Sequence, residues 1–223
     1  MDEFNNDKNN VSNVLLPHLY MITGFNLSES GLFLDKLEKH FKEGIKLVQL
    51  RVKELSAEEY RKLAICAIQI EKKYQAILLL NSAIQMVSEL NASGIHLTSE
   101  LLMQLQERPL TQDKFISASC HNEKELLKAA AIGVNFVTLS PVLHTKSHPE
   151  VRPLGWSAFR ALCEKANVPV YALGGLSEND LPMAVEHGAY GIAAISSLWE
   201  RTYPALDVTI SNIPYKYGKK TFL

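Results

Sequence analysis

The chain has 223 residues, 47% of them hydrophobic, and a formal net charge of −1. This is enough sequence for one α/β domain with a large core, and the near-neutral charge gives no general attraction to nucleic acid or anionic membranes. Three cysteines without a CxxC spacing argue against a disulfide framework or a zinc site, and they favour a reducing, cytoplasmic location.

Both ends of the chain have the composition of tails. Residues 1–13 hold five asparagines and few apolar side chains, which is typical of disorder. No basic start is followed by an apolar run, so we expect no secretory signal, and no apolar stretch is long enough to span a bilayer. We expect one folded domain over residues 14–210, followed by a C-terminal tail over residues 211–223.

Between the tails, short apolar runs alternate with longer amphipathic patterns. The predicted strands are Leu19–Thr23, Leu47–Arg51, Ile77–Asn81, Gly94–Thr98, Phe115–Ser119, Phe136–Ser140, Val170–Leu173 and Gly191–Ile195. The predicted helices are Leu32–Lys42, Ala57–Lys73, Ile84–Leu90, Leu101–Gln106, Glu123–Ile132, Trp156–Lys165, Asn179–His187 and Ser197–Tyr203. This strict alternation favours an α/β fold with a single closed (β/α)8 TIM barrel over an open doubly wound sheet.

In such a barrel, functional side chains follow the carboxyl ends of the strands. Gln49, Arg51 and Lys53 end the second predicted strand at a period of two, which aims all three side chains to one side. A glutamine and two cations that converge at a strand end suit a polar, anionic ligand. The alternative is that Arg51 and Lys53 are solvated loop charges.

The next three strands also end in polar residues. Asn81, His96 and Ser119 occupy these places and are candidate substrate-binding residues, and His121 follows Ser119 closely. His121 is the predicted catalytic acid/base, because an imidazole at the mouth of the barrel suits proton transfer near neutral pH. His96 lies within a strand pattern, so it either faces into the barrel as a structural residue or faces the mouth as a functional one.

The last two predicted strands end in small residues that predict a phosphate-binding cup. Gly174 and Gly175 follow the seventh strand, and Ser196 and Ser197 follow the eighth. Glycines allow close approach of the backbone to a ligand, and serines can start a helix whose free N–H groups point outward. Such N–H groups are a common binding site for phosphate.

The loop after the sixth strand, residues 140–149, is rich in hydroxyl, imidazole and ammonium groups. It contains Thr145 and Ser147, which are candidate substrate-binding residues. We expect this loop to close over a phosphate ester, and the alternative is an ordinary proline-containing surface loop.

Seven motifs, in this order between about residue 15 and residue 200, resemble those of the thiamine-phosphate synthase superfamily, which includes the TenI-like thiazole tautomerases. They are Gln49-Leu-Arg-Val-Lys53, Asn81, Gly94-Ile-His-Leu97, Ser119-Cys-His121, Ser140-Pro-Val-Leu-His-Thr145, Ala172-Leu-Gly-Gly-Leu176 and Gly191-Ile-Ala-Ala-Ile-Ser196. The sequence around residues 140–145 and 171–199 is most similar to the synthase-like domain fused to Nudix hydrolases in some bacterial proteins, although no Nudix motif is present here. The resemblance implies a barrel that binds a phosphorylated thiazole-like ligand.

The resemblance also implies where a synthase of this superfamily holds magnesium. One aspartate directly follows the asparagine of the third strand, and a second lies in the loop after the fourth strand. Here these places hold Ser82 and Leu101, with Glu100 as a weak substitute, and His148 replaces a diphosphate-binding lysine. Because Mg²⁺ requires oxygen ligands, we predict no metal site and no cofactor, with Mg²⁺ entering only in the synthase alternative.

Three functions stay open on this basis. The leading hypothesis is a metal-independent, TenI-like thiazole isomerase in which His121 moves the proton. The alternative is a thiamine-phosphate synthase that joins a pyrimidine diphosphate to a thiazole phosphate with Mg²⁺. The third is a non-catalytic protein that binds phosphorylated thiamine precursors or partners a Nudix hydrolase. A homo-oligomer is compatible with each, and no nucleic-acid or membrane partner is expected.

Overall fold

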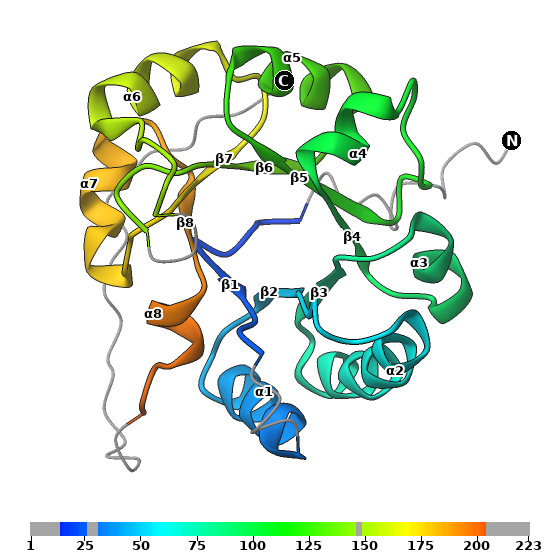
Figure 1. Cartoon of the computed structure of the whole chain (residues 1–223). Helices are drawn as coiled ribbons and strands as arrows, with labels where there is room; N and C mark the ends of the chain where they lie inside the picture. Colours follow the sequence, from blue (N-terminus) through cyan, green and yellow to red (C-terminus); the bar gives the residue numbers. More distant parts are fainter. Residues whose placement is uncertain (1–13, 26–30, 146–148, 204–223) are drawn as a thin grey trace, which may run out of the picture.

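The computed structural model describes residues 14–25, 31–145 and 149–203 (Figure 1). The tails predicted for residues 1–13 and 211–223 lie outside these ranges. Within them, no helix is both long enough and apolar enough to cross a membrane.

Eight parallel strands close into one barrel in the order of the sequence (Figure 1). They are β1 (Leu19–Ile22), β2 (Leu47–Leu50), β3 (Ile77–Leu80), β4 (Gly94–Leu97), β5 (Phe115–Cys120), β6 (Phe136–Leu139), β7 (Val170–Leu173) and β8 (Gly191–Ala194). The barrel closes where β1 pairs with β8, with Leu19 opposite Ile192. The predicted single (β/α)8 TIM barrel is thereby confirmed.

The helices surround the barrel on its outside (Figure 1). They are α1 (Phe33–Lys42), α2 (Ala57–Tyr74), α3 (Ile84–Leu90), α4 (Ser99–Gln104), α5 (Glu123–Ile132), α6 (Gly155–Lys165), the 3-10 turn η3 (Glu178–Asp180), α7 (Leu181–Glu186) and α8 (Ser196–Trp199). The start of α2 is fixed by a capping box in which Ser56 Oγ accepts from the Glu59 N–H and the Glu59 carboxylate accepts from the Ser56 N–H.

The bounds of several predicted helices differ in the structure, and two of these differences bear on the candidate site. The helix expected over Leu101–Gln106 begins two residues earlier, because Thr98 is its N-cap and its Oγ1 accepts from the Leu101 N–H at 3.2 Å. Glu100 and Leu101 therefore lie in the first turn of α4 rather than in a loop. The last helix, expected over Ser197–Tyr203, is the single turn Ser196–Trp199.

Side chains alternate along the strands between two cores. Outward-facing residues such as Val48, Leu80 and Val137 pack against the helices. Inside the barrel, the rings of Tyr20, Phe136 and Tyr171 pack on one another with centroids 5.2–5.7 Å apart. These rings fill the barrel interior where they lie, and in barrels of this type ligands bind toward the carboxyl ends of the strands.

Candidate active site

A polar network occupies the barrel interior above the aromatic rings. Gln49 Nε2 donates to the Tyr20 hydroxyl at 3.1 Å, and that hydroxyl lies 3.2 Å from His96 Nδ1. The Ser117 hydroxyl is 2.7 Å from the same imidazole nitrogen. His96 thus faces into the barrel rather than out of its mouth, and Gln49 is a buried member of the same network.

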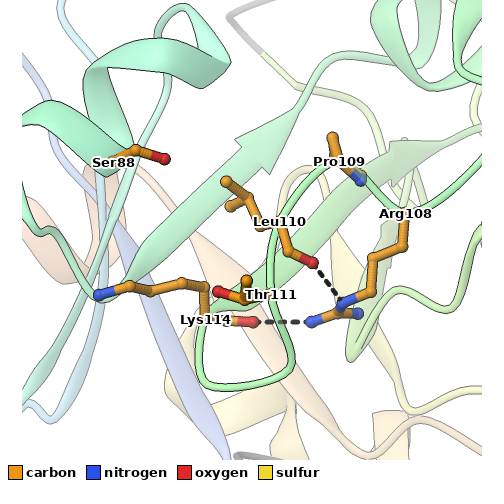
Figure 2. Close-up of a pocket in the computed structure, with 6 residues that line it drawn as sticks. All are labelled: Ser88, Arg108, Pro109, Leu110, Thr111 and Lys114. Carbon is orange, nitrogen blue, oxygen red and sulfur yellow. Dashed lines mark hydrogen bonds between the residues drawn. The ribbon is translucent and has the colours of Figure 1, made fainter.

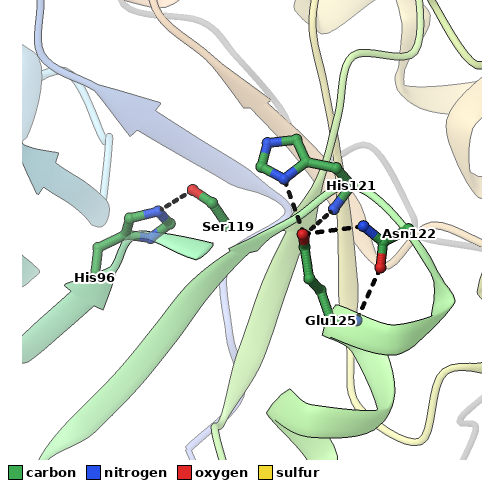
Figure 3. A network of polar contacts seen from close by, with 5 residues as sticks. All are labelled: His96, Ser119, His121, Asn122 and Glu125. Atoms are coloured by element: carbon green, nitrogen blue, oxygen red, sulfur yellow. Dashed lines mark hydrogen bonds and ion pairs between the residues drawn. The ribbon is translucent and has the colours of Figure 1, made fainter. Parts of the chain in front are cut away.

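Burial determines the charge of His96. Desolvation, reinforced by the positive charge of Arg51, lowers the pKa of His96 to about 3. The imidazole is therefore neutral, with one nitrogen that donates and one that accepts. Its Nε2 lies 2.8 Å from the Ser119 hydroxyl, which is partly exposed nearer the carboxyl end of the barrel. His96 consequently orients the hydroxyl of Ser119, as Figure 3 shows.

Arg51 is a half-buried cation just beyond the end of β2. Its backbone is held on both sides by Thr23 Oγ1, which accepts from the Arg51 N–H at 2.9 Å and donates to the Arg51 carbonyl at 3.0 Å. Burial lowers the pKa of the guanidinium, and the nearby Glu54 charge opposes this effect. Among the described residues, no hydrogen-bond acceptor pairs with the guanidinium. The contact between Thr23 and Arg51 was not predictable from local sequence, because the two residues come from neighbouring strands.

Lys53 and Asn81 complete the polar residues at the ends of β2 and β3. Lys53 is exposed, and its backbone N–H donates to the Glu54 carboxylate. The Asn81 amide donates to the His96 carbonyl at 3.1 Å, which ties the end of β3 to β4. Arg51 is therefore the cation that the structure anchors, whereas Lys53 projects from the loop.

His121 lies directly after β5 with 45% of its side chain exposed. Its Nδ1 is 2.9 Å from the Glu125 carboxylate, which also accepts the His121 backbone N–H (Figure 3). Asn122 caps α5, because its Oδ1 accepts from the Glu125 N–H. Asn122 and Glu125 stand three residues apart, as in a capping box, but one Glu125 carboxylate oxygen instead orients the imidazole of His121. The four-residue spacing from His121 to Glu125 was the available signal.

The glycine pair after β7 packs against the loop that follows β6. Gly174 has φ +106° and Gly175 has φ +69°, a region that favours glycine. A Cβ on Gly174 would lie 2.8 Å from Pro141, and a Cβ on Gly175 would collide with the His144 carbonyl. The sequence-based reason for these glycines was close approach to a ligand. The structure gives a second reason, which is close approach of two loops.

Ser196 and Ser197 begin α8 at the end of β8, and both are exposed. The Ser197 hydroxyl donates to the Leu176 carbonyl at 2.8 Å and so joins this turn to the loop after β7. Among the described residues, the N–H groups of Gly175, Ser196 and Ser197 donate to no backbone carbonyl. The two loops therefore present unpaired donors at neighbouring strand ends.

Thr145 is partly buried in the loop after β6, and Ser147 lies outside the described residues. The described residues do not fit the two-carboxylate magnesium site that the resemblance implied. Ser82 offers only a hydroxyl, Leu101 packs against the apolar core, and Glu100 is exposed on α4. No group of three or more His, Cys, Asp or Glu side chains gathers within the described ranges.

A separate hollow of about 550 Å³ lies at the start of β5, at the other end of the strands (Figure 2). Arg108 lines it, but its guanidinium donates to the carbonyls of Leu110, Gly133 and Lys114. Lys114 Nζ in turn donates to Asn91. Both cations in this lining already have oxygen partners, unlike the guanidinium of Arg51, and we assign Arg108 a structural role.

Comparisons with known proteins converge on one family. A family model described as thiamine monophosphate synthase matches residues 19–198. A protein of Aquifex aeolicus named "Putative thiamine-phosphate synthase 2" is 37% identical over 185 residues, which cover 83% of this chain and 99% of the relative. A "Thiamine-phosphate synthase" of Clostridium novyi is 30% identical and covers 81% of this chain and 89% of the relative.

Solved structures share the fold. A thiamine phosphate pyrophosphorylase from Pyrococcus furiosus superposes with a TM-score of 0.66 at 21% identity, over 82% of this chain and 90% of that one. A thiamine phosphate pyrophosphorylase from Bacteroides thetaiotaomicron gives a TM-score of 0.57 at 22% identity, over 86% of this chain and 90% of that one. At these identities the likeness establishes the barrel alone.

Proposed function

Because this chain belongs to the thiamine monophosphate synthase family, we propose that it is a synthase-type transferase acting on two phosphorylated thiamine precursors. In this reaction the ring nitrogen of a thiazole phosphate donates its electron pair to the methylene carbon of a pyrimidine diphosphate. The new C–N bond forms as the C–O bond to the diphosphate breaks, and the diphosphate leaves with that electron pair. The relatives favour this reaction over the isomerase that was our leading hypothesis from sequence.

The observation that carries the proposal is the half-buried guanidinium of Arg51, which has no hydrogen-bond acceptor among the described residues. A cation at the rim of the barrel, partly removed from water, binds an anion more strongly than a solvated one does. Guanidinium also matches the geometry of phosphate oxygens. We assign Arg51 to the departing diphosphate, with Lys53 as a second, exposed cation.

We assign the phosphate of the thiazole substrate to the ends of β7 and β8. The unpaired N–H groups of Gly175, Ser196 and Ser197 support this assignment, because backbone donors in a turn bind phosphate oxygens well. Gly174 positions the loop, and Thr145 and Ser147 belong to the neighbouring loop after β6. Ser119, oriented by His96, is then left for the heterocyclic part of the substrates.

Magnesium has no assigned place in this proposal. Ser82 and Leu101 supply no carboxylate, and Glu100 alone does not make the two-aspartate site of the superfamily. The negative charge that develops on the departing diphosphate is instead met by Arg51 and Lys53. We accordingly expect no saturable binding of Mg²⁺ to the protein without substrate.

The lack of carboxylates at the expected magnesium site also keeps the isomerase as a second candidate. Moving a double bond in a thiazole carboxylate phosphate requires a phosphate site and a proton shuttle but no metal carboxylates. His121, oriented by Glu125 at 2.9 Å, provides the acid/base for that reaction. In that reaction, replacing His121 by alanine would slow isomerisation by about 10²–10⁴-fold.

The test is to incubate the purified full chain with pyrimidine diphosphate and thiazole phosphate and to quantify thiamine phosphate by chromatography. Parallel reactions contain Mg²⁺ or a chelator, and a third follows isomerisation of a thiazole carboxylate phosphate. We expect thiamine phosphate to form. Isomerisation without coupling would replace the synthase by the second candidate, and the absence of both activities would contradict both enzyme assignments.

A further inference from the structure

One buried hydroxyl in the barrel has no partner. Thr138, the next-to-last residue of β6, is 0% exposed. Its Oγ1 is the only buried side-chain oxygen or nitrogen among the described residues that makes no hydrogen bond. Leaving a buried hydroxyl unpaired costs folding free energy, whereas valine has nearly the same shape without that cost. The presence of threonine at this position therefore points to a partner that is absent from the free protein.

The strand pattern places Thr138 inside the barrel. Phe136 belongs to the interior cluster, whereas Val137 and Leu139 belong to the core beneath the helices. Because side chains alternate along a strand, Thr138 shares the inner face with Phe136. In the sheet register Thr138 lies beside Ser119, whose hydroxyl is held by His96. The unpaired hydroxyl is thus at the depth of a residue already assigned to the substrate.

The surroundings at this depth are uncharged. Ser119 and Gln49 are neutral, and the imidazole of His96 is neutral as well. The cation Arg51 lies beyond the end of β2, closer to the rim. The rim therefore suits an anionic group, because it holds the Arg51 cation. The level of Thr138 suits an uncharged polar ring, because the side chains there are neutral. A substrate that carries a heterocycle and a diphosphate would thus place its diphosphate at the rim and its heterocycle at the level of Thr138.

We propose that Thr138 Oγ1 donates a hydrogen bond to the pyrimidine ring of the diphosphate substrate, an inference that rests on the proposed function. The chemistry of the two rings selects the pyrimidine. The single ring nitrogen of the thiazole is the nucleophile and must stay free to attack. The pyrimidine has ring nitrogens that accept hydrogen bonds without taking part in the reaction.

The first measurement is the unfolding temperature of the ligand-free protein. Thr138→Val removes the unpaired hydroxyl, so we expect a rise of about 2–4 °C. Thr23→Val is the matched control, because Thr23 is also 0% exposed but makes two hydrogen bonds to the backbone of Arg51. That variant should unfold at a lower temperature than the wild type.

The second measurement is binding, by calorimetry, of pyrimidine diphosphate and of inorganic diphosphate. We expect Thr138→Val to weaken pyrimidine diphosphate binding about five- to tenfold and to leave inorganic diphosphate unchanged. Thr138→Ser keeps the hydroxyl and should keep the affinity for pyrimidine diphosphate within about twofold of the wild type.

The outcomes separate this inference from the proposed function. A lower unfolding temperature of Thr138→Val would show that the hydroxyl holds an internal water in the free protein, and the inference would be wrong. Equal effects on the two ligands, or none on either, would also overturn it while leaving the proposed function intact. If the wild type binds pyrimidine diphosphate no better than inorganic diphosphate, the proposed function itself fails, and this inference with it.

Discussion

The imidazole of His96 is buried in the barrel interior and is neutral. Its pKa is lowered to about 3 by burial and then by Arg51, while Ser117 and Ser119 hold its two nitrogens. In the unfolded chain a histidine titrates near pH 6.5. Below that pH the unfolded chain therefore binds a proton at this residue, whereas the folded chain does not. Stability from this residue is present above pH 6.5 and is lost as the pH falls toward 3.

We therefore predict that the free energy of unfolding falls between pH 6.5 and pH 4, with His96 contributing at most about 1.4 kcal/mol per pH unit. His96→Gln should make this fall shallower, although the variant is less stable at pH 7 because it loses hydrogen bonds to Ser117 and Ser119. Urea unfolding at closely spaced pH values measures both effects. An identical pH slope in the variant and the wild type would contradict a buried neutral imidazole.

At the rim, Arg51 offers a test that needs no substrate. Arg51→Gln removes a half-buried cation, so we predict that inorganic diphosphate binds about 10- to 100-fold more weakly, as expected for a charge-assisted hydrogen bond. Arg160→Gln is the matched control, because Arg160 is an exposed arginine on α6 that pairs with Glu164 four residues on. Calorimetric titration of both variants measures the difference, and equal losses would show that Arg51 acts only through net charge.

Among the elements, the loops after β6 and β7 depend on each other. The Leu143 N–H donates to the Gly174 carbonyl at 3.0 Å, and the His144 carbonyl occupies the space that a side chain on Gly175 would need. We predict that Gly175→Ala destabilises the protein by more than about 2 kcal/mol, because it adds a backbone collision to the strain of positive φ.

The matched control is Gly133→Ala. Gly133 has φ +77° at the end of α5, with no atom within 4 Å of an added Cβ, so it isolates the cost of positive φ, about 1 kcal/mol. Thermal unfolding of both variants compares them directly. Gly175→Ala should also weaken the binding of thiazole phosphate, because the loop after β6 has to move. Equal destabilisation of the two variants would rule out the collision.

Element bounds were predictable where a local signal was sufficient. The predicted start of α2 at Ala57 is confirmed, and the Ser56/Glu59 capping box is the local signal that fixes it. The predicted start of α4 was wrong by two residues, because the prediction ends a strand at Thr98 whereas the Thr98 hydroxyl caps the helix. Thr98 fits both a strand end and a helix cap, and only the position of the Leu101 N–H distinguishes the two.

For the molecule as a whole, the number and order of the strands followed from the sequence, because each buried strand is a short apolar run and each helix has a separate amphipathic pattern. The side-chain contacts inside the barrel could not be predicted from the sequence. Three features depend on the register between strands far apart in sequence. They are the inward orientation of His96, the two hydrogen bonds between Thr23 and the Arg51 backbone, and the unpaired hydroxyl of Thr138. A single sequence carries little information about such register.

The hydrogen-bond network around His96 also bears on how this barrel could be divided. Tyr20 and His96 come from β1 and β4, in the first half of the chain, whereas Ser117 and Ser119 come from β5, in the second. A half-barrel fragment ending before β5 would lose both serine partners of the imidazole, and the complementary fragment would lose the imidazole. Two separately made halves thus each lack polar partners that only the other supplies, so recombination into one barrel satisfies groups that neither fragment satisfies alone.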